Sequence, residues 1–575
     1  VYSDPISALV KLRTFAEFSV KAVFAHYRLE HGYQSTLNDL LHDPSFKAIT
    51  PGVVQDKLHL LRVKGNHAAH GTLFKEAEAE VPEYLRQAHD LSRWLMLSLL
   101  GRPAADLPEW TPLPKVDEET QESLRRKNKA AQEKIAQQEA LMAQLLADLE
   151  KARSQAEGEK KSEAERSQIL KHAQQAASVL DFSEEETRFK LIDEQLLAAG
   201  WRVGARGQST PEVGQEVEVG GQSTGSGKGF ADYVLYDPAS GKPLAVIEAK
   251  KTAEDADKGK MQARYYADGL EEESGVRPVI FYSNGYEIYI WDDAKGEPPR
   301  PLFGFYSRDS LQYLHFQRAE REPALGPLNP SEKIVDRLYQ IEAIKRVGEA
   351  FDKRRRKALI IQATGTGKTR VAIALAELMI RARWAKRILF LCDRRELRKQ
   401  ARDAFEEFLP GEPRIYITAR TSADRNQRIY LATYPAMMRC FQNFDVGFFD
   451  LVIADESHRS IYNRYRDLFR WFDACQLGLT ATPLKFVFRN TYRLFECENE
   501  DPTFNYPYEE AVAHEPPYLC PFKAIKHTTK FLREGIKYKE LDTVQREQVD
   551  DQVEDSEAVD YAQEEVSRKV FNEDT

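Results

Sequence analysis

Hydrophobic residues follow different spacings in successive parts of the chain, and each change of spacing predicts a change of fold. In residues 1 to about 100 they recur at helical spacing, as in ISALVKLRTFAEFSVKAVFAHY and YLRQAHDLSRWLMLSLL. A proline-rich stretch from Pro103 to Pro114 ends this pattern, because proline interrupts regular helices. We therefore expect an all-α domain over residues 1–112.

Residues 113–180 keep the composition of a helix but have only a weak apolar face. Asn128 and Gln138 interrupt a heptad-like series, and apolar positions nearly vanish after Gly158. The series consists of Leu124, Ala131, Ile135, Met142, Leu145, Leu149 and Ala152. This pattern favours a solvated helical spacer, with a weak dimerising coiled coil as the alternative.

The next two regions mix strand-like and helix-like patterns. In residues 181–325 a helical segment, EEETRFKLIDEQLLAAG, precedes the strand-like runs DYVLYD, LAVIEAK, PVIFYSN and YEIYIWD. We expect the glycine-rich segment from Gly204 to Gly229 to be a mobile loop. In residues 326–500 short apolar strands alternate with helices, which is typical of a parallel sheet. The sequence thus predicts a multidomain α/β protein with a small mixed-sheet domain and a doubly wound parallel-sheet domain.

Composition excludes several classes of protein. The chain has 575 residues, of which 42% are hydrophobic and 30% charged, and its net charge is −9. These values exclude a collagen, a disulfide-bonded miniprotein and a wholly disordered chain, and nucleic-acid binding would need local basic surface. The five cysteines form no Cys-x-x-Cys pair, and no apolar run approaches the ~18 residues of a membrane helix. We expect a cytoplasmic protein without a secretory signal or a membrane partner.

A phosphate-binding motif is the most informative segment. It runs LIIQATGTGKT from Leu359 to Thr369, a buried strand followed by a glycine-containing turn and a helix that begins near Lys368. Backbone N–H groups of such a turn and the N-terminus of the helix bind phosphate. Lys368 would reach the β- and γ-phosphates of ATP, and the Thr369 hydroxyl would bind Mg²⁺, although Gln362 replaces the first glycine of the general pattern. The other nucleotide-binding residues predicted in the turn are Thr364, Gly365, Thr366 and Gly367.

A second strand carries acidic residues suited to the same reaction. The run FFDLVIA ends in Asp455, Glu456, Ser457 and His458. Asp455 would hold Mg²⁺ through water, Glu456 would polarise the attacking water, and His458 would couple the nucleotide state to neighbouring motifs. Phosphoryl transfer depends mainly on positioning and on charge neutralisation, and these residue types supply both.

Together the two motifs resemble the first motor domain of superfamily 2 helicases and translocases, which is RecA-like. Four further segments match the motifs of this family in its order. The resemblance implies that Gln340 recognises adenine, that Arg394 lies on a DNA-contacting loop and that Thr433 touches backbone phosphate. It also implies that Thr480 and Thr482 link hydrolysis to movement.

The second half of such a motor is not evident. Beyond Pro483 no Gln-x-x-Gly-Arg-x-x-Arg segment follows, which in this family supplies the arginine fingers that accelerate hydrolysis by about 10³–10⁵. The chain also does not begin with Met, so we expect a fragment of a longer protein. Residues 501–575 would be the start of a truncated second motor domain or an acidic tail, and the fragment would bind ATP weakly without translocating.

Three acids and a lysine form a second candidate site. Glu186 lies in a predicted helix, Asp232 opens one strand, and Glu248 and Lys250 end the next one. Strand alternation places Glu248 and Lys250 on one face, where Asp232 from the neighbouring strand would share Mg²⁺ with Glu248. The metal would stabilise charge on a scissile phosphate, and Lys250 would orient the water. The alternative is a surface ion pair at a strand edge.

This order of residues resembles the PD-(D/E)xK nucleases, with Ala231 in place of the proline before Asp232. The resemblance adds Glu186 as a further metal ligand. Gln262 and Tyr266 resemble the Q-x-x-x-Y motif that accompanies the nuclease centre in type I restriction enzymes.

A nuclease-like domain followed by a motor domain resembles the restriction (R, motor) subunit of type I restriction–modification enzymes, over about residues 182–520. The resemblance implies ATP-driven translocation of double-stranded DNA followed by cleavage, with ATP and Mg²⁺ as cofactors. It also implies methylation and specificity subunits as partners, because this subunit carries no target recognition itself. The chain has no methylase motif, so we expect methylation to reside in another chain. Two alternatives remain: a stand-alone superfamily 2 helicase–nuclease, and a DNA- or partner-docking subunit whose nuclease-like domain is inactive.

Two basic or polar segments have both a functional and a structural interpretation. Residues 353–357, KRRRK, fit a DNA contact, and the alternative is a solvated turn before the next strand. Arg62 and His67 resemble the R-x(4–6)-H centre of HEPN-like RNase modules. In the alternative, Asn66, His67 and His70 cap or pack helices.

Overall fold

The structure is a computed structural model. It describes residues 5–29, 35–69, 77–111, 163–179, 184–222, 227–249, 256–284, 287–418, 420–455, 465–482, 485–486, 489–521, 536–537 and 560–561. The chain divides into two compact units, Val1–Pro507 and Tyr508–Thr575. The first unit is a mixed α/β structure that contains one mixed and one parallel sheet.

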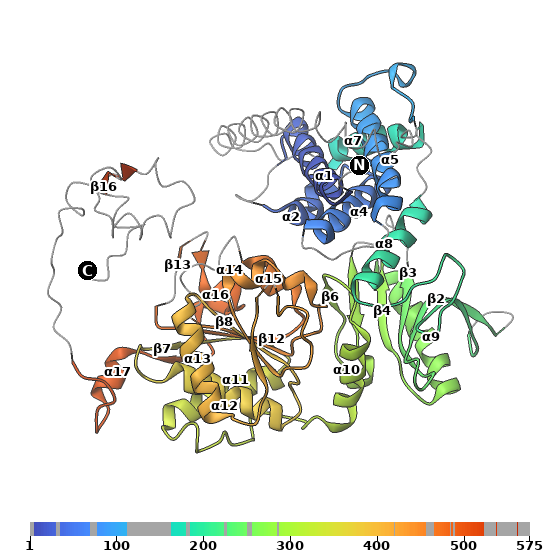
Figure 1. Ribbon diagram of the computed structural model, residues 1–575. Coiled ribbons are helices and arrows are strands. Elements are labelled where there is room, and N and C mark those ends of the chain that lie inside the picture. Colours follow the sequence, from blue (N-terminus) through green and yellow to red (C-terminus); the bar gives the residue numbers. More distant parts are fainter. Residues whose placement is uncertain are drawn as a thin grey trace, which may run out of the picture. The chain divides into compact units, whose positions relative to one another are not determined.

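The N-terminal part of the first unit is helical, as the apolar spacing predicts (Figure 1). Its helices are α1 (Pro5–Tyr27), α2 (Leu37–His42), α3 (Pro44–Lys47), α4 (Gly52–Ala69) and α5 (Ala77–Ser98). Buried side chains such as Leu12, Val20 and Leu58 form their core. Helices α1 and α4 approach closely at Gly65, where a Cβ atom would lie only 2.3 Å from the Cβ of Arg13.

Helix α7 (Glu163–Val179) lies within the range predicted as a solvated spacer, yet it belongs to the same core. Ala173, Ala176 and Ala177 are buried there, and the indole nitrogen of Trp94 in α5 donates to the carbonyl of Ala173 over 3.1 Å. Small alanine side chains let the helices pack closely without a conspicuous apolar stripe, which is why the sequence pattern missed the contact. The rest of the predicted spacer, residues 112–162, lies outside the described residues.

A six-stranded mixed sheet follows, with its strands in the order β1-β2-β3-β4-β5-β6. The strands are β1 (Val213–Val219), β2 (Gly229–Tyr236), β3 (Pro243–Ala249), β4 (Val279–Ser283), β5 (Ile288–Trp291) and β6 (Arg300–Leu302). All neighbours are antiparallel except β3 and β4, which helix α9 (Ala256–Ser274) connects. Helix α9 covers one face of the sheet, and α8 (Glu184–Ala198) and α10 (Arg308–Glu320) cover the other.

Strand β1 corrects the prediction of a mobile loop between Gly204 and Gly229. Its seven residues pair with β2 along most of their length, and Val213 and Val219 are fully buried. The glycines around these valines concealed the strand, since glycine is usually typical of turns. Sheet pairing and burial of the valines decide the local structure instead.

The parallel sheet has seven strands in the order β15-β7-β12-β11-β8-β10-β9. They are β7 (Lys357–Gln362), β8 (Ile388–Cys392), β9 (Arg414–Tyr416), β10 (Ile429–Thr433), β11 (Leu451–Ala454), β12 (Cys475–Thr480) and β15 (Phe504–Tyr506). Every pair of neighbours is parallel, as the alternation of strands and helices predicts. Strand β15 lies beyond the expected domain end at residue 500, and it completes the sheet by pairing with β7.

Helices cover both faces of this sheet and form a separate core on each side. One face carries α11 (Leu338–Asp352), α12 (Lys368–Arg381) and α13 (Arg395–Phe408), and the other carries α14 (Tyr434–Met438) and α15 (Arg466–Trp471). A short hairpin, β13 (Lys485–Phe486) and β14 (Arg489–Asn490), and α16 (Thr491–Leu494) precede β15. The doubly wound arrangement expected from the sequence is therefore present.

The second unit is sparsely described. It contains helix α17 (Tyr508–Ala513) and the short antiparallel strands β16 (Ile536–Lys537) and β17 (Asp560–Tyr561). The Tyr508 hydroxyl donates to the carbonyl of Cys520 over 2.8 Å. Among the described helices of the whole chain, none combines the length and apolar character that crossing a membrane requires.

A buried carboxylate joins the two sheets of the first unit. Asp473, just before β12, accepts hydrogen bonds from the guanidinium of Arg300 in β6 at 2.8–3.0 Å and from the Tyr306 hydroxyl at 2.5 Å. Arg356, just before β7, completes the cluster with an ion pair of 2.8 Å. Burial alone would raise the pKa of Asp473, but Arg300 and Arg356 hold it well below its ordinary value.

Replacing this carboxylate should destabilise the first unit strongly. In Asp473→Ala, Arg300 would lose the carboxylate that accepts from it at 2.8–3.0 Å and keep its ion pair with Glu297, and Arg356 would lose its ion pair with Asp473. Removing one member of a buried pair costs about 3–5 kcal/mol. We expect a clear fall in the urea midpoint of unfolding, followed by fluorescence at neutral pH. Because the native pKa is depressed, this stabilisation is present at neutral pH and is lost as pH falls below the carboxyl's unfolded pKa.

Asp268→Ala is the matched control, since that carboxylate is 51% exposed and pairs with Arg277. An exposed pair contributes only about 0–1 kcal/mol. Equal midpoints for Asp473→Ala and Asp268→Ala would contradict the role assigned to the buried cluster.

Candidate functional site

The predicted phosphate-binding loop connects β7 to the start of α12, as the motif requires. Gly365 and Gly367 have φ angles of 85° and 91°, in the left-handed region that favours glycine. Helix α12 begins at Lys368, whose ammonium group lies 3.4 Å from the carbonyl of Gln362 and whose side chain is 8% exposed. The lysine thus lies folded over the loop, where its charge would meet phosphate.

The carbonyl of Thr366 holds this loop in place. It accepts hydrogen bonds from the side-chain amides of Gln362 and Gln340, at 2.9 and 3.0 Å, and from the Tyr339 hydroxyl at 2.7 Å. Gln362 is the residue that departs from the general glycine pattern, and its fully buried side chain stabilises the turn through this hydrogen bond. The departure therefore has a structural purpose that the sequence alone did not reveal.

Gln340, predicted to recognise adenine, lies beside the loop. Its side chain is 1% exposed, and a Cβ atom on Gly367 would lie 2.6 Å from its amide nitrogen. Next to it, the rings of Tyr339 and Tyr506 stack with centroids 4.0 Å apart. Sequence reasoning missed both tyrosines; the position of Tyr339 beside Gln340 was the available signal. Adenine recognition by Gln340 stays a prediction.

The other predicted motor residues lie at the same edge of the sheet. Strand β12 lies between β7 and β11, so Thr480 at the end of β12 and Asp455 after β11 flank the loop edge. Asp455 is 8% exposed and Thr480 is fully buried, whereas Thr482, whose N–H donates to the Thr480 hydroxyl, is exposed. Thr369 is the second residue of α12. The structure therefore brings the predicted ATP and Mg²⁺ residues together along adjoining strand ends.

The predicted DNA-contacting residues lie further along this edge. Thr433 ends β10, and Arg394, an exposed residue, precedes α13 after β8. The predicted catalytic residue Glu456 and the predicted coupling residue His458 lie outside the described residues. Their roles therefore stay predictions.

In the mixed sheet, the two predicted metal-binding acids come together. The antiparallel register of β2 and β3 pairs Tyr233 with Ile247, so the next step places Asp232 opposite Glu248. A carboxylate oxygen of Asp232 accepts a hydrogen bond from the N–H of Ala249 over 2.6 Å, and Glu248 is 3% exposed. Carboxylates facing each other on neighbouring strands are a suitable donor set for a hard divalent cation.

Other residues of this predicted centre are only partly described. Lys250 lies outside the described residues, and Glu186 lies in α8 with its side chain outside them. The predicted Q-x-x-x-Y pair does meet: the Gln262 amide donates to the Tyr266 hydroxyl over 2.8 Å on α9. Across the described part of the chain, no group of three or more His, Cys, Asp or Glu side chains is placed to hold a metal ion. Metal binding therefore stays a prediction.

One acid of this region escaped the sequence analysis. Asp193 in α8 accepts a hydrogen bond from the Tyr233 hydroxyl over 2.9 Å, and burial raises the pKa of its carboxyl to about 6. It follows Glu186 by seven residues, a spacing that returns to the same side of a helix. With Tyr233 it lies on the α8 face of the sheet, whereas Glu248 alternates with Ile247 and Ala249 and belongs to the α9 face. The heptad spacing from Glu186 was the signal that could have found it.

The structure places Arg62, one residue of the predicted RNase centre, beside a cavity. It lies in α4 and lines a cavity of about 220 Å³ with Asn38, His42 and Asn66. Burial lowers the pKa of its guanidinium to about 10. The side chain of His67 and the whole of His70 lie outside the described residues, so the RNase hypothesis stays untested.

Two family models match the chain. Residues 110–299 match "Type I restriction enzyme R protein N terminus (HSDR_N)", and residues 333–485 match "Type III restriction enzyme, res subunit". The first match contains Asp232, Glu248 and the Gln262–Tyr266 pair, and the second contains the phosphate-binding loop. Both descriptions concern restriction enzymes.

Curated relatives agree with these models. The EcoKI type I endonuclease subunit of Escherichia coli (strain K12) is 26% identical, with 97% of this chain and 57% of the relative covered. The EcoAI type I endonuclease subunit of Escherichia coli is 31% identical, with 59% and 43% covered. The chain spans about half the length of these two relatives.

Among solved structures, one described as a fragment of a type I restriction enzyme HsdR subunit from Vibrio vulnificus YJ016 is 28% identical. The match covers 56% of this chain and 59% of that chain, with a TM-score of 0.26. The relationship therefore rests on the sequence matches.

Gly367→Ala should disable the phosphate-binding loop. The side chain would be strained at φ 91° and would collide with the Gln340 amide. We expect a loss of stability of about 1–3 kcal/mol and at least a tenfold weaker binding of a fluorescent ATP analogue. Gly411→Ala is the control, because a Cβ atom there meets nothing within 4 Å. Unchanged analogue binding in Gly367→Ala would show that the loop tolerates a different conformation.

Proposed function

We propose, on the premise that this chain is a homologue of the endonuclease subunits of type I restriction enzymes, that it couples ATP hydrolysis to movement along double-stranded DNA and cuts that DNA. One observation carries the proposal: a single compact unit contains the facing acids Asp232 and Glu248 and, further along the chain, the phosphate-binding loop. The two family matches follow the same order. Cleavage and a motor would then reside in one polypeptide.

In the motor, each residue would act through its place at the strand ends. Bound ATP with Mg²⁺ would supply the phosphoryl group and the charge of the cation. Lys368 would neutralise the β- and γ-phosphates, while the loop of Thr364, Gly365, Thr366 and Gly367 would present its N–H groups. Thr369 and Asp455 would hold the cation, and Gln340 would bind adenine. Glu456 would polarise the attacking water.

The remaining motor residues would convert hydrolysis into movement. Thr480 ends β12 and Thr482 follows it. This strand lies between the loop strand and the Asp455 strand, so a shift at the phosphates would reach both residues directly. His458 would complete that link. Arg394 and Thr433 would hold the DNA backbone at the ends of the next strands. Movement would then need a second motor lobe.

In the nuclease-like module, Asp232 and Glu248 would hold Mg²⁺, with Glu186 as a third ligand. The cation would stabilise charge on the scissile phosphate and help to generate hydroxide. Lys250 would orient the attacking water or stabilise the pentavalent phosphate. The hydrogen bond between Gln262 and Tyr266 joins side chains one turn apart on α9, and Tyr266 packs against the sheet; the pair would support this centre.

We further propose the domain division expected from the sequence, with two shifts. Helix α7 joins the N-terminal helical domain of residues 1–112, and β15 joins the RecA-like domain of residues 326–500. The nuclease-like domain covers residues 181–325. Apart from α7 and β15, the spacer and residues 501–575 keep the limits predicted from the sequence. Methylation and specificity subunits would supply target recognition in a cytoplasmic complex.

Two lysine substitutions should separate the activities in the complete subunit assembled with its partners. Lys250→Ala should reduce cleavage of plasmid DNA by about 10²–10³ while DNA-stimulated ATP hydrolysis continues, because only the nuclease centre is changed. Lys368→Ala should abolish ATP hydrolysis and, with it, cleavage. Gel analysis of the plasmid and a phosphate-release assay measure the two activities.

Lys242→Ala serves as control, since this exposed lysine lies in the same module between β2 and β3. If Lys250→Ala cut as fast as Lys242→Ala, the nuclease assignment would be wrong. Strong DNA-stimulated hydrolysis and cleavage by the subunit without its partners would favour the stand-alone helicase–nuclease instead.

A further inference from the structure

A cavity of about 640 Å³ lies between the mixed and the parallel sheet. On one side it is lined by residues of the β5–β6 region and α10, and on the other by Arg356, Asp450 and Cys475. These last three residues stand where β7, β11 and β12 begin, whereas the phosphate-binding loop follows the end of β7. The cavity is therefore separated from that loop by the length of the strand, about 20 Å.

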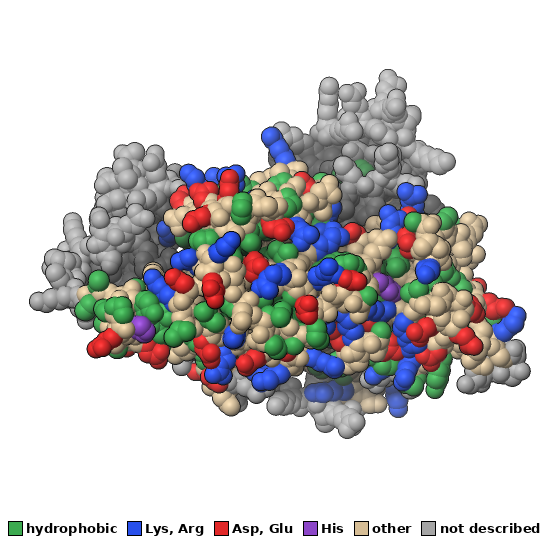
Figure 2. Space-filling view, turned by 90° about the horizontal axis from the view of Figure 1, so that it is seen from below, with side chains coloured by type: hydrophobic (Ala, Val, Ile, Leu, Met, Phe, Trp, Pro, Cys, Tyr) green, Lys and Arg blue, Asp and Glu red, His purple; other side chains and the backbone are tan. Residues whose placement is uncertain are grey.

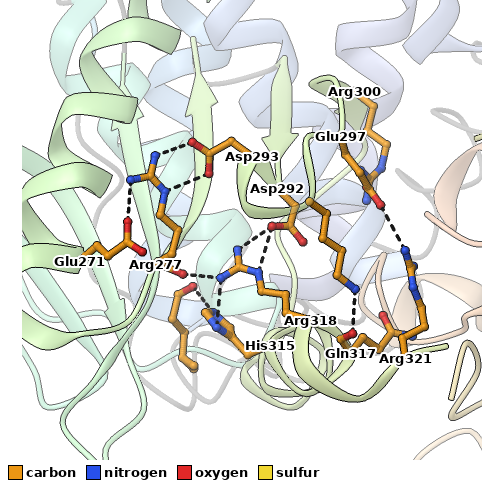
Figure 3. A network of polar contacts seen from close by, with 12 residues as sticks. Glu271, Arg277, Asp292, Asp293, Glu297, Arg300, His315, Gln317, Arg318 and Arg321 are labelled. Atoms are coloured by element: carbon orange, nitrogen blue, oxygen red, sulfur yellow. Dashed lines mark hydrogen bonds and ion pairs between the residues drawn. The ribbon is translucent and has the colours of Figure 1, made fainter. Parts of the chain in front are cut away.

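The acidic side chains of this cavity are engaged by other groups of the protein or have a raised pKa. Its lining includes seven cationic and five acidic residues. Asp473 binds Arg300 and Arg356. Asp292 binds Arg318 at 2.7 Å (Figure 3). The others are Glu297, paired with Arg300 at 3.0 Å, Asp352, which accepts from the N–H groups of Leu325 and Gly326, and Asp450, whose pKa burial raises to about 7.

Several cations of the lining lack a close carboxylate partner. The Lys295 ammonium donates to the carbonyl of Gln317 over 2.8 Å. Arg321 lies 3.9 Å from Glu297 (Figure 3). Burial, followed by the charge of Arg321, lowers the pKa of Lys295 to about 8. The cavity thus has an excess of positive charge that an anion would compensate.

The basic residues 353–357 differ in their partners at the cavity. Arg356 and Lys357 are committed to structural pairs, with Asp473 and with Glu496. Arg354 has a φ of 63°, and within the described ranges its guanidinium donates to the carbonyl of Gly296 alone, over 2.6 Å. The exposed Arg355 lines the cavity, and in the described part of the chain no residue forms a hydrogen bond or ion pair with its guanidinium. The run is therefore more than a solvated turn.

The aromatic side chains of the lining are already engaged. Arg321 lies over the Trp384 ring at 4.3 Å, and the indole nitrogen donates to the carbonyl of Glu322. Tyr313 stacks on Phe316 with centroids 5.8 Å apart. Base stacking on these rings is thus disfavoured, whereas guanidinium groups are well suited to phosphate oxygens. The chemistry favours a ligand recognised by its phosphates.

We propose that this cavity is a second phosphate-binding site, formed by Lys295, Arg354 and Arg355, and that the backbone of a nucleic-acid strand occupies it. The inference rests on the proposed action on DNA and adds a contact far from the nucleotide loop. Overall charge cannot create such a contact, because basic and acidic side chains are interspersed over the face seen in Figure 2 and the chain has a net charge of −9. A local group of unmatched cations can create a phosphate contact.

Lysine footprinting tests the site directly in the full chain. An amine-reactive reagent is applied at about pH 8, and modification of Lys295 is quantified by mass spectrometry, with the exposed Lys333 as internal reference. A short single-stranded oligonucleotide at ten times its Kd should slow modification of Lys295 about tenfold, since about nine in ten sites are then filled. Lys333 should react unchanged.

Inorganic tripolyphosphate serves as the second probe. Protection by the oligonucleotide supports the proposal. Protection by tripolyphosphate alone overturns the nucleic-acid strand as occupant and assigns the site to a free polyphosphate or nucleotide. Absence of protection by both probes overturns the site itself.

A charge variant gives an independent measurement. In Lys295→Gln with Arg355→Gln, the slope of log K against log salt for single-stranded DNA should decrease by about 1.4, because about 0.7 is lost for each phosphate contact. The control, Lys333→Gln with Arg102→Gln, removes the same charge from exposed positions outside the cavity. Equal slopes for the two double variants would overturn the inference.

The outcomes also separate this inference from the proposed function. If the assembled enzyme hydrolyses ATP and cuts DNA but Lys295 is never protected, only the second site is wrong. If Lys295 is protected while ATP hydrolysis and cleavage are absent, the translocase–nuclease proposal fails and the phosphate site stands.

Discussion

The buried carboxylate of Asp473 is the interaction on which the arrangement of the two sheets depends. A charge removed from water is tolerated only when opposite charges and hydrogen-bond donors surround it, and Arg300, Arg356 and Tyr306 provide them. Arg300 and Tyr306 come from the mixed-sheet region, while Arg356 and Asp473 precede strands of the parallel sheet. Tyr306 also packs against Gly447, where a Cβ atom would lie 2.5 Å from its ring. The cluster thus fixes where β7 and β12 begin.

The same strands carry the candidate chemistry at their other ends. Because neighbouring strands of the sheet are parallel, residues that follow β7, β12 and β11 must meet at one edge. The loop after β7, Thr480 and Asp455 are therefore assembled by backbone pairing alone, without contacts specific to each pair of side chains. Strands β7 and β12 connect the phosphate-binding loop and Thr480 to the Asp473 cluster, which also contains Arg300 and Tyr306 of the mixed-sheet region.

The sequence predicted what local pattern determines and missed what only packing determines. Local pattern was enough to predict the alternation of strands and helices, the LIIQATGTGKT loop and the pairing of Asp232 with Glu248. The structure places Asp232 opposite Glu248. Helix α7 was assigned to the spacer, because alanine contacts leave no strong periodic signal. Strand β1 was missed because glycines surround it. Strand β15 was missed because its three residues are too few to show a periodic pattern.

Individual side chains were missed for the same reason. The importance of Gln362 and Tyr339 lies in a single shared acceptor, the carbonyl of Thr366, which no spacing in the sequence reveals. Asp193 acquires its raised pKa from burial beside Tyr233, residues that are 40 positions apart. Likewise, the run KRRRK has one composition but two physical roles, because Asp473 and Glu496 neutralise only its last two members. Charge on a surface acts on a ligand only to the extent that the fold leaves it uncompensated, and this is a property of contacts rather than of composition.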